Sequence, residues 1–217
     1  MQIQVFQNNP LQVNTYILYD KTREAAIIDP GMSTDSEKEA IAKFIKCNDL
    51  KVKYIIATHP HIDHVLGAGF SVKAFGAPLW MHEGGLQRVY SHCVAYGVAF
   101  GMDCEKEDFP QPDHFVADGD EICFGDETLT VLETPGHCAG SICLYHHASG
   151  SVFVGDLVFR DSVGRSDLPT GDMQQLADSI QNKIRPLPDS TIIFPGHGPT
   201  TTVEHEKNCN PYFYRES

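Results

Sequence analysis

The sequence predicts an α/β sandwich in which helices cover two packed β-sheets. Short apolar runs of strand length alternate with amphipathic helical patterns along the chain. The second half contains closely spaced strands around tight Asp-Gly turns, which is typical of an antiparallel meander. Sheets and helices in this order must bury their apolar faces against each other, and a layered sandwich does so. No linker, low-complexity tract or fixed repeat interrupts the 217 residues, so we expect a single domain over residues 1–217.

The first half predicts five strands and two regular helices. Strands are expected at residues 3–6, 13–19, 25–29, 52–58 and 78–81. Helical patterns lie between them at 36–47 and 65–75. A less regular helical stretch, broken by glycines, is expected over 83–101.

The second half predicts a meander, a helix and a final strand. Strands are expected at residues 121–124, 128–133, 141–146, 151–154 and 191–194. A helix is expected over 172–184, and one face of it would carry Met173, Leu176, Ala177, Ile180 and Ile184. Two prolines soon after this pattern end the helix, and the proline- and glycine-rich residues 195–199 predict a loop.

Composition excludes several classes of partner. The chain has 29 Asp and Glu against 16 Lys and Arg, a net charge of −13, and no run of basic residues. Nucleic acids and anionic membranes reward clustered cations, so neither is an expected partner. No segment approaches about 20 apolar residues and no secretion signal is evident. The seven Cys residues are scattered without a Cys-x-x-Cys motif, so we expect a cytoplasmic protein.

The segment after the strand at 52–58 carries a metal-binding pattern. His59, His61, Asp63 and His64 fall within six residues. Imidazoles and carboxylates are the donors that Zn²⁺ and Fe²⁺ accept. His59 and His61 can turn to one side of an extended segment, whereas the adjacent Asp63 and His64 point in different directions, which favours two metal positions. A solvated polar loop is the alternative, but no packing requirement explains this succession of residues.

Three later loops each offer one further ligand. His137, Asp156 and His197 each follow an apolar strand and a glycine, which lets the backbone approach a buried centre. Any one of them could be a simple turn residue. Their recurrence after the histidine cluster is better explained by one shared metal site. Cys138 and Ser141, which flank His137, are expected to be packing and turn residues because neither has an evident partner base.

These motifs together resemble the metallo-β-lactamase superfamily, and within it the compact branch of glyoxalase II-like hydroxyacylglutathione hydrolases. The resemblance runs from the Asp-Pro-Gly at 29–31 through residues 58–64 to Gly164-Arg165-Ser166-Asp167 and the Gly-His-Gly-Pro at 196–199. It implies an αββα four-layer sandwich with two metal ions between the sheets. The implied ligands are His59, His61 and His137 for the first metal, Asp63, His64 and His197 for the second, and Asp156 as the bridge.

The resemblance also implies a residue that supports a metal ligand from outside, and it implies a reaction. Asp29 would accept a hydrogen bond from a ligand imidazole, although a turn-forming Asp-Pro-Gly explains it equally well. Two divalent ions, zinc first with iron or manganese as alternatives, would supply a bridging hydroxide at neutral pH. That hydroxide would attack a 2-hydroxyacyl thioester such as a lactoyl thioester, and Asp63 would take up or return a proton. The implied enzyme is a binuclear metallohydrolase that acts on thioesters.

Substrate recognition is expected from two arginines in the loop at 159–167. Arg160 or Arg165 could clamp the carboxylate of an anionic thioester. The alternative is that they pair with Asp161 or Asp167 and order the loop. The chain departs from the glutathione-thioester hydrolases here, because they carry Lys and Tyr in this loop. They also have a Tyr in the last metal loop, where this chain has Gly198-Pro199, and a C-terminal helical region, which we do not expect in this chain.

Three other functions are weighed against the thioesterase. A persulfide dioxygenase of the same superfamily would hold a single iron on His59, His137 and Asp156, with open positions for oxygen and a thiol. A β-lactamase is less expected without a secretion signal. A non-catalytic metal-binding or interaction protein is the alternative of a different class, against which the complete set of seven ligand positions argues.

Overall fold

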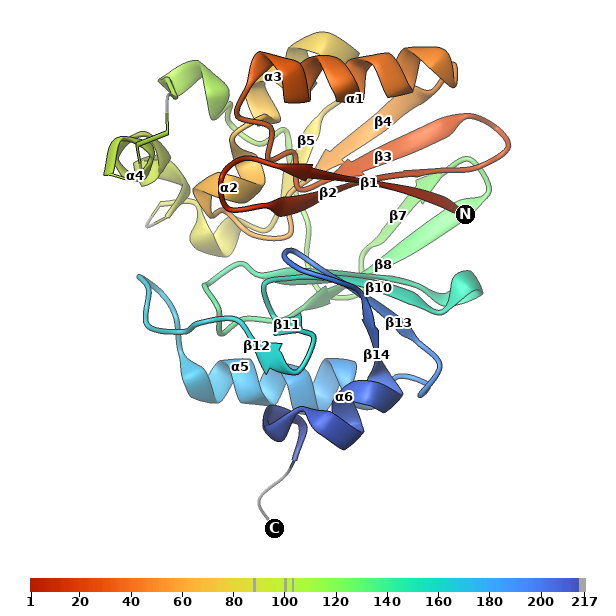
Figure 1. Ribbon diagram of the computed structural model, residues 1–217, viewed down its shortest axis with the longest axis vertical. Coiled ribbons are helices and arrows are strands. Elements are labelled where there is room, and N and C mark those ends of the chain that lie inside the picture. The colour runs from red at the N-terminus through yellow and green to blue at the C-terminus, as the bar shows by residue number, and fades with distance from the viewer. Residues whose placement is uncertain (88, 100, 103, 215–217) are drawn as a thin grey trace.

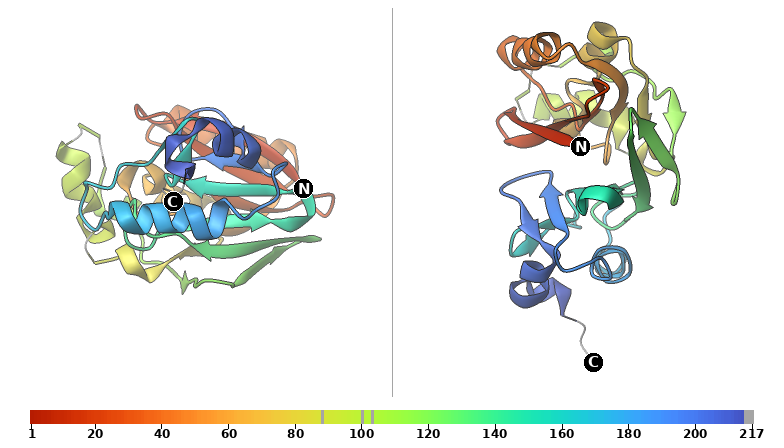
Figure 2. Two further views of the ribbon diagram at one scale, coloured as in Figure 1. Left: turned by 90° about the horizontal axis from the view of Figure 1, so that it is seen from below. Right: turned by 90° about the vertical axis from the view of Figure 1, so that its right-hand side faces the viewer.

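The structure is a computed structural model that describes residues 1–87, 89–99, 101–102 and 104–214. Four layers follow one another as helices, sheet, sheet and helices (Figure 1). The same layers are seen edge-on in the right-hand view of Figure 2, whereas the left-hand view looks along the direction in which they stack. The predicted α/β sandwich, with helices on the outside of two packed sheets, is therefore confirmed.

The first sheet contains the strands of the N-terminal half in chain order. Pairing is antiparallel among the first three strands and parallel among the last four. In β2 the side chains alternate, so that Tyr16 and Leu18 face the second sheet while Ile17 faces the helices. The strands are β1 (Gln2–Asn8), β2 (Val13–Tyr19), β3 (Glu24–Ile28), β4 (Lys51–Ile56), β5 (Leu79–Met81) and β6 (His114–Phe115).

The second sheet contains strands of the C-terminal half in the order β14-β13-β10-β9-β8-β7. Only β10 and β13 pair in parallel there among the described strands. Its strands are β7 (Glu121–Phe124), β8 (Glu127–Glu133), β9 (Ile142–His146), β10 (Ser151–Gly155), β13 (Ile192–Pro195) and β14 (Thr201–Thr202). A small separate hairpin joins β11 (Val158–Phe159) to β12 (Ser162–Val163).

Helices cover the outer faces of both sheets (Figure 1). The first sheet is covered by α1 (Asp35–Cys47) and α3 (Ala68–Phe75), and the second by α5 (Met173–Ser179), the π-helical turn η5 (Ile180–Ile184) and α6 (Val203–Cys209). Two short helices, α2 (Ile62–Val65) and α4 (Cys93–Ala99), lie at one end of the first sheet. The 3-10 turns are η1 (Glu83–Gly85), η2 (Tyr90–His92), η3 (Lys106–Asp108), η4 (His147–Ser149) and η6 (Pro211–Phe213). Within the described ranges, no helix is long and apolar enough to cross a membrane.

Three hydrophobic cores separate the four layers. One lies between the first sheet and its helices and contains Ile27, Ile41 and Ile55. The middle core lies between the sheets and contains Phe153 among other large side chains. The third packs Leu176 and the residues that follow it against the second sheet. Because the sheets meet across an apolar layer, the loops at their ends can bring polar residues from both halves together.

The predicted helix at 65–75 is in fact two helices, and this changes where two candidate ligands lie. The first of them, α2, begins three residues earlier than predicted and includes Asp63 and His64. Gly67 then separates it from α3, and its backbone N–H donates to the Pro30 carbonyl oxygen at 2.7 Å. A side chain at Gly67 would meet that same carbonyl, so the tight packing of this turn explains the break.

Other predicted elements differ at their ends. Met173 is 48% exposed, so the predicted apolar face of the later helix starts at Leu176. The stretch at 83–101 contains η1, η2 and α4, while residues 88 and 100 within it lie outside the described part. Pro195 belongs to β13 rather than to the predicted loop. The two-residue strands β6, β11, β12 and β14 were too short to show periodicity, whereas α6 had an N-terminal signal in the Thr202 cap that sequence reasoning missed.

Candidate metal centre

The candidate ligands come together at one end of the sandwich, where loops of both sheets meet. His59 and His61 follow β4, Asp63 and His64 lie in α2, and the other three follow β8, β10 and β13. Strand ends place them here because the two sheets stack with these ends on the same side. The residues brought together are His59, His61, Asp63, His64, His137, Asp156 and His197.

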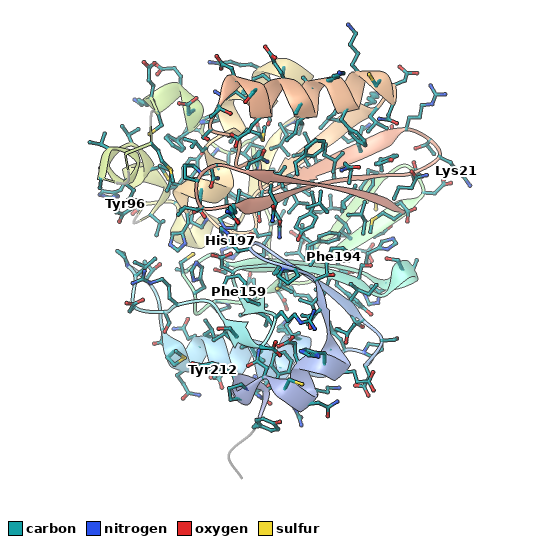
Figure 3. All side chains as sticks on the ribbon, viewed as in Figure 1. Lys21, Tyr96, Phe159, Phe194, His197 and Tyr212 are labelled. Carbon is teal, nitrogen blue, oxygen red and sulfur yellow. The ribbon has the colours of Figure 1, made fainter. Side chains whose placement is uncertain are left out.

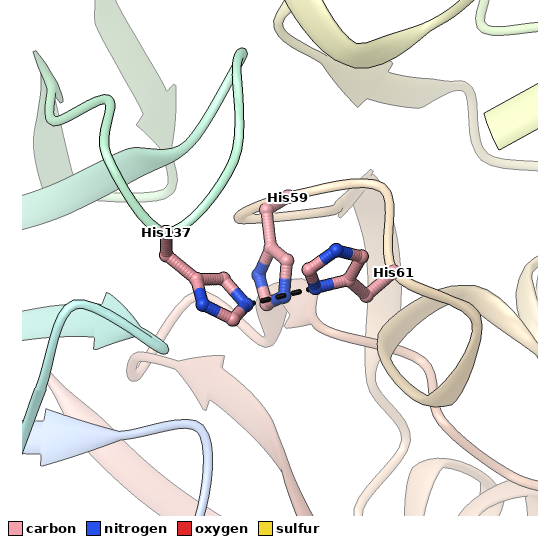
Figure 4. Close-up of side chains that lie close together, drawn as sticks. All are labelled: His59, His61 and His137. Carbon is pink, nitrogen blue, oxygen red and sulfur yellow. Dashed lines mark hydrogen bonds between the residues drawn. The ribbon is translucent and has the colours of Figure 1, made fainter. Parts of the chain in front are cut away.

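Three imidazoles form the first group (Figure 4). His137 Nε2 lies 2.8 Å from His61 Nδ1. The ring centroid of His59 lies 4.8 Å from that of His61 and 4.9 Å from that of His137. One nitrogen from each ring lies within 4.8 Å of the other two, so the three lone pairs can converge on one ion.

Asp63, His64 and His197 form the second group. His197 Nε2 lies 3.1 Å from Asp63 Oδ2, and His64 Nε2 lies 3.5 Å from the same oxygen. Asp63 and His64 are consecutive, yet they contribute side chains to one group because the short helix α2 turns the chain between β4 and α3. One carboxylate and two imidazoles again make a set of donors suited to a divalent transition metal.

Asp156 lies between the two groups. Its Oδ1 is 3.3 Å from His64 Nε2, and its Oδ2 is 3.6 Å from His137 Nε2 and 3.7 Å from His197 Nε2. The residue directly follows Gly155, whose φ of 50° turns the chain sharply at the end of β10. A single carboxylate therefore reaches members of both groups.

Backbone carbonyls hold the outer nitrogen of two of the imidazoles. His137 Nδ1 bonds the carbonyl oxygen of Arg165 at 2.7 Å, and His197 Nδ1 bonds the carbonyl oxygen of Leu11 at 2.9 Å. A carbonyl can only accept, so each Nδ1 carries the proton and each Nε2 keeps its lone pair for the cluster. Sequence reasoning missed Leu11 and the Arg165 carbonyl because a backbone acceptor leaves no signature in the residue type.

Asp29 combines both roles that its sequence context allowed. It has a φ of 51°, in the left-handed region of the turn before Pro30. Its Oδ2 lies 2.9 Å from His64 Nδ1, as implied for an outer partner of a ligand imidazole. Its carboxylate also accepts from the Thr58 backbone N–H at 2.7 Å and from the Thr58 hydroxyl at 2.8 Å. The side chain is 1% exposed, so these three bonds fix it.

Unsatisfied buried atoms indicate that the cluster fits a metal. His59 Nε2, His64 Nε2 and Asp156 Oδ1 are buried and make no hydrogen bond of good geometry within the described structure. An unmet buried polar atom costs about 1–3 kcal/mol, and these three all point into the cluster. Metal ions coordinated at this point would satisfy them.

The protonation states of the clustered residues also suit a bound metal. Burial lowers the pKa of His59 well below its usual value and that of His61 to about 4, so both imidazoles are neutral. Burial alone would raise the pKa of Asp156, but the nearby His64 and His197 lower it, so the carboxylate stays ionised. Neutral imidazoles and ionised carboxylates are the forms that bind metals.

The pKa of His64 is shifted in the opposite direction to those of His59 and His61. Burial would lower its pKa, but the carboxylates of Asp156, Asp63 and Asp29 outweigh burial and raise the pKa well above its usual value. Three carboxylates around one imidazole thus favour a positive charge here. A divalent cation meets that demand as well as a proton does.

A cavity of about 500 Å³ opens onto the cluster and is lined by five of the candidate ligands and by Arg165. Figure 3 shows His197 and Phe159 where the two halves meet, on the same side of the molecule as Tyr96. The rest of the wall is largely apolar or aromatic and includes Leu11, Ile62, Val89, Tyr96, Phe159 and Leu168. This wall was not predicted, because its members come from loops far apart in the chain.

The two candidate substrate-binding arginines pair within their own loop. Arg165 Nε and Nη2 donate to the two carboxylate oxygens of Asp167 at 2.7 and 2.8 Å. Arg160 Nε lies 3.9 Å from Asp161 Oδ2, and Arg160 is not among the lining residues of the cavity. Both contacts correspond to the expected alternative in which the arginines order the loop.

Comparison with known proteins agrees with this geometry. A sequence model of the Metallo-beta-lactamase superfamily matches residues 8–197. The chain is 33% identical to hydroxyacylglutathione hydrolase GloC of Haemophilus influenzae, over 100% of both chains. Two solved structures are also similar: TTHA1623 in a di-iron-bound form (34% identical, TM-score 0.85, 96% of this chain and 99% of that one) and the B3 metallo-beta-lactamase BLEG-1 (32% identical, TM-score 0.86, 98% and 99%).

Proposed function

The chain belongs to the metallo-β-lactamase superfamily, whose members are generally metal-dependent hydrolases, and we propose that it is a binuclear hydrolase cleaving a 2-hydroxyacyl thioester. A lactoyl thioester is the representative substrate. The similarity to the hydroxyacylglutathione hydrolase of Haemophilus influenzae, over the full length of both chains, supports this substrate class.

The observation that carries the proposal is the pair of ligand groups joined by Asp156. We assign His59, His61 and His137 to the first metal and Asp63, His64 and His197 to the second. Asp156 would contact both, since its two oxygens face members of both groups. A pair of divalent ions held there would lower the pKa of water to about 7 and polarise a carbonyl oxygen.

The chain's own residues would orient the ligand imidazoles and transfer protons. Asp63 lines the cavity, and in the proposed reaction its carboxylate would accept a proton from water and return it. Burial would raise the pKa of Asp63, but His64 and His197 lower it, which keeps it ionised as such a role requires. Asp29 holds His64 in one tautomer, and the Arg165 carbonyl does the same for His137.

The main alternative, a persulfide dioxygenase, needs one redox iron on His59, His137 and Asp156. That reaction gives no role to the group of Asp63 and His197, which is as closely assembled as the first group. The complete second group therefore favours the hydrolase. Oxygen consumption with a persulfide, in protein that contains iron alone, would establish the dioxygenase instead.

A combined metal and activity measurement tests the proposal. Metal content is determined by mass spectrometry on the same preparation that is assayed against a panel of thioesters. We expect about two metal ions per chain and hydrolysis of lactoyl thioesters. Asp156→Ala should lose most of the metal and at least about 10²-fold in kcat/KM, whereas Asp126→Ala, at an exposed site, should behave as the wild type. No turnover of any thioester by protein with two metals would contradict the proposal.

Zinc and a cytoplasmic location belong to the same proposal. Zinc suits both groups of imidazoles and carboxylates, although iron and manganese accept the same donors. Exposed thiols at Cys47, Cys123 and Cys209 suit a reducing compartment. Full metal occupancy without turnover of a broad ester and thioester panel would instead indicate a non-catalytic metal-binding protein.

A further inference from the structure

Among the residues that the structure describes, the wall of the cavity beyond the candidate ligands has little that could bind a charged substrate. Leu11, Ile62, Val89, Phe159 and Leu168 present hydrocarbon, and Tyr96 adds one hydroxyl. Among the described residues that line it, Arg165 is the one basic side chain outside the ligand cluster. Charged ligands are bound through paired or bidentate groups, so the described part of this wall, which is uncharged apart from Arg165, disfavours them.

Asp167 already pairs with the guanidinium group of Arg165. Both guanidinium contacts are made to the two oxygens of one carboxylate, in the geometry that a substrate carboxylate would otherwise use. The pairing holds the pKa of Asp167 at about 2, through its hydrogen bonds with Arg165. An anionic substrate would have to displace an internal carboxylate before it could be clamped.

We infer that the enzyme acts on thioesters whose thiol portion is uncharged and apolar. Asp167 disfavours an anionic thiol portion because it already occupies the guanidinium group of Arg165. This inference rests on the proposed thioesterase function and narrows its substrate class. A glutathione thioester, with two carboxylates and an ammonium group, matches the wall poorly. A cavity of about 500 Å³ has room for the acyl group beside the candidate ligands and for a short aliphatic or aromatic thiol portion.

A series with one acyl group measures the preference directly. Lactoyl thioesters of glutathione, of the neutral thiol N-acetylcysteamine, and of N-acylcysteamines with acyl chains of four and six carbons share the same reacting carbonyl. Each added methylene that enters the cavity should raise kcat/KM about threefold to fourfold until the wall is filled. We expect the longer neutral thioesters to exceed lactoylglutathione by at least about tenfold. Equal or higher kcat/KM for lactoylglutathione would overturn the inference and leave the thioesterase function intact.

Two pairs of variants test the residues. Leu168→Asn should reduce the gain per methylene, whereas the matched Leu168→Met keeps an apolar wall and should preserve it. Asp167→Asn releases Arg165 and should raise kcat/KM for lactoylglutathione by up to about fivefold, the range expected of an exposed pair. The gain should vanish in Asp167→Asn combined with Arg165→Gln. A gain of the same size without Arg165 would overturn the role given to Asp167.

Binding provides a readout that does not depend on turnover. Thioether analogues of the same thiols, which cannot be hydrolysed, are titrated into metal-loaded protein by calorimetry. Tighter binding of the long neutral analogue than of the glutathione analogue is expected. If the neutral analogue binds more tightly but no thioester turns over, the proposed function fails while the apolar preference holds. If thioesters turn over and the analogues bind equally, the preference fails alone.

Discussion

At the scale of single residues, the centre depends on which nitrogen of each imidazole faces it. His137 and His197 present Nε2 because a backbone carbonyl accepts from their Nδ1, whereas His61 directs Nδ1 inward toward His137. His64 differs again, since a buried carboxylate holds its outer nitrogen. The nitrogen that each candidate ligand presents is therefore set by its outer hydrogen-bond partner as well as by the position of the imidazole itself.

Asp29→Asn tests this dependence. The new amide oxygen can still accept from the Thr58 N–H, but its NH₂ group would donate to His64 Nδ1 and so move the imidazole proton to Nε2. A protonated Nε2 cannot bind metal, so we expect a 10- to 100-fold loss of affinity for one metal. Competition titration with a chromogenic chelator measures it, with exposed Asp35→Asn as the control. Unchanged affinity for both metals would refute the role of Asp29.

Thiol reactivity should separate the cysteines by burial. Burial raises the pKa of Cys143 to about 12, only partly offset by its contact with the Thr134 hydroxyl, so almost no thiolate forms at pH 8. Exposed Cys47, Cys123 and Cys209 should be alkylated by iodoacetamide within minutes, and Cys143 at least about 100-fold more slowly. Peptide mass spectrometry measures each rate. Equal rates in native protein, as expected in urea, would contradict this.

At the scale of elements, the start of α1 is tied to the turn after β1. Thr34 caps the helix, and Glu37 accepts backbone N–H groups from Asn9 at 2.7 Å, Ser33 at 2.8 Å and Thr34 at 2.9 Å. Asn9 in turn donates to the Asp63 carbonyl oxygen at 2.9 Å. One carboxylate thus links a helix cap to the loop beside the metal ligands.

Glu37→Gln should lower the free energy of unfolding by about 1–2 kcal/mol at pH 7. Burial would raise the pKa of Glu37, but the three N–H bonds outweigh it and depress the pKa below its usual 4.5. A depressed carboxyl pKa stabilises the fold above the unfolded value and loses that effect as pH falls through the folded value. Urea unfolding should therefore show the difference between the two proteins shrinking below about pH 4.5. A constant difference down to pH 3 would exclude the charged cap.

Gly136 connects the His137 loop to α5. It has a φ of 135°, and a Cβ there would meet the backbone of Leu176 at the start of the buried helix face. Gly136→Ala should cost about 2–4 kcal/mol, from both strain and overlap, and should reduce metal content by displacing His137. Gly119→Ala is the matched control, since its φ is also positive but nothing lies near. Equal urea midpoints for both variants would show that the overlap is unimportant.

At the scale of the whole molecule, each half provides an incomplete site. The N-terminal half carries His59, His61, Asp63 and His64, and the C-terminal half carries the other three. Each of the two ligand groups contains residues from both halves. Bound metals would therefore stabilise the packing of one sheet against the other as well as enabling chemistry.

Metal removal should lower thermal stability. At free metal of about 100 times Kd, one site contributes about 2.7 kcal/mol, which for a chain of this size corresponds to a Tm change of about 5–10 °C. Calorimetry before and after treatment with dipicolinate measures it, and added zinc should restore the Tm. His59→Ala combined with His197→Ala should show little response to either treatment. An unchanged Tm in the wild type after verified metal loss would contradict the linkage.

The sequence by itself determined the layered α/β fold and the residue types that gather at the candidate centre. Apolar periodicity is local, so Val13–Tyr19 and Glu121–Phe124 could be located from neighbouring residues alone. The ligand types also stand in recognisable motifs at strand ends. The break between α2 and α3 was missed, because it depends on Gly67 packing against Pro30, which is distant in sequence.

Only the tertiary structure decided how these residues meet. It placed the oxygens of Asp156 toward both ligand groups and aligned backbone carbonyls behind His137 and His197. The physical reason is that a hydrogen bond or ion pair needs atoms within about 3 Å, and the packing of the sheets and loops sets those distances between residues that are separated in sequence, as far apart as Leu11 and His197. Residue types define the available chemistry, and packing selects which donors, acceptors and charges remain available to a substrate.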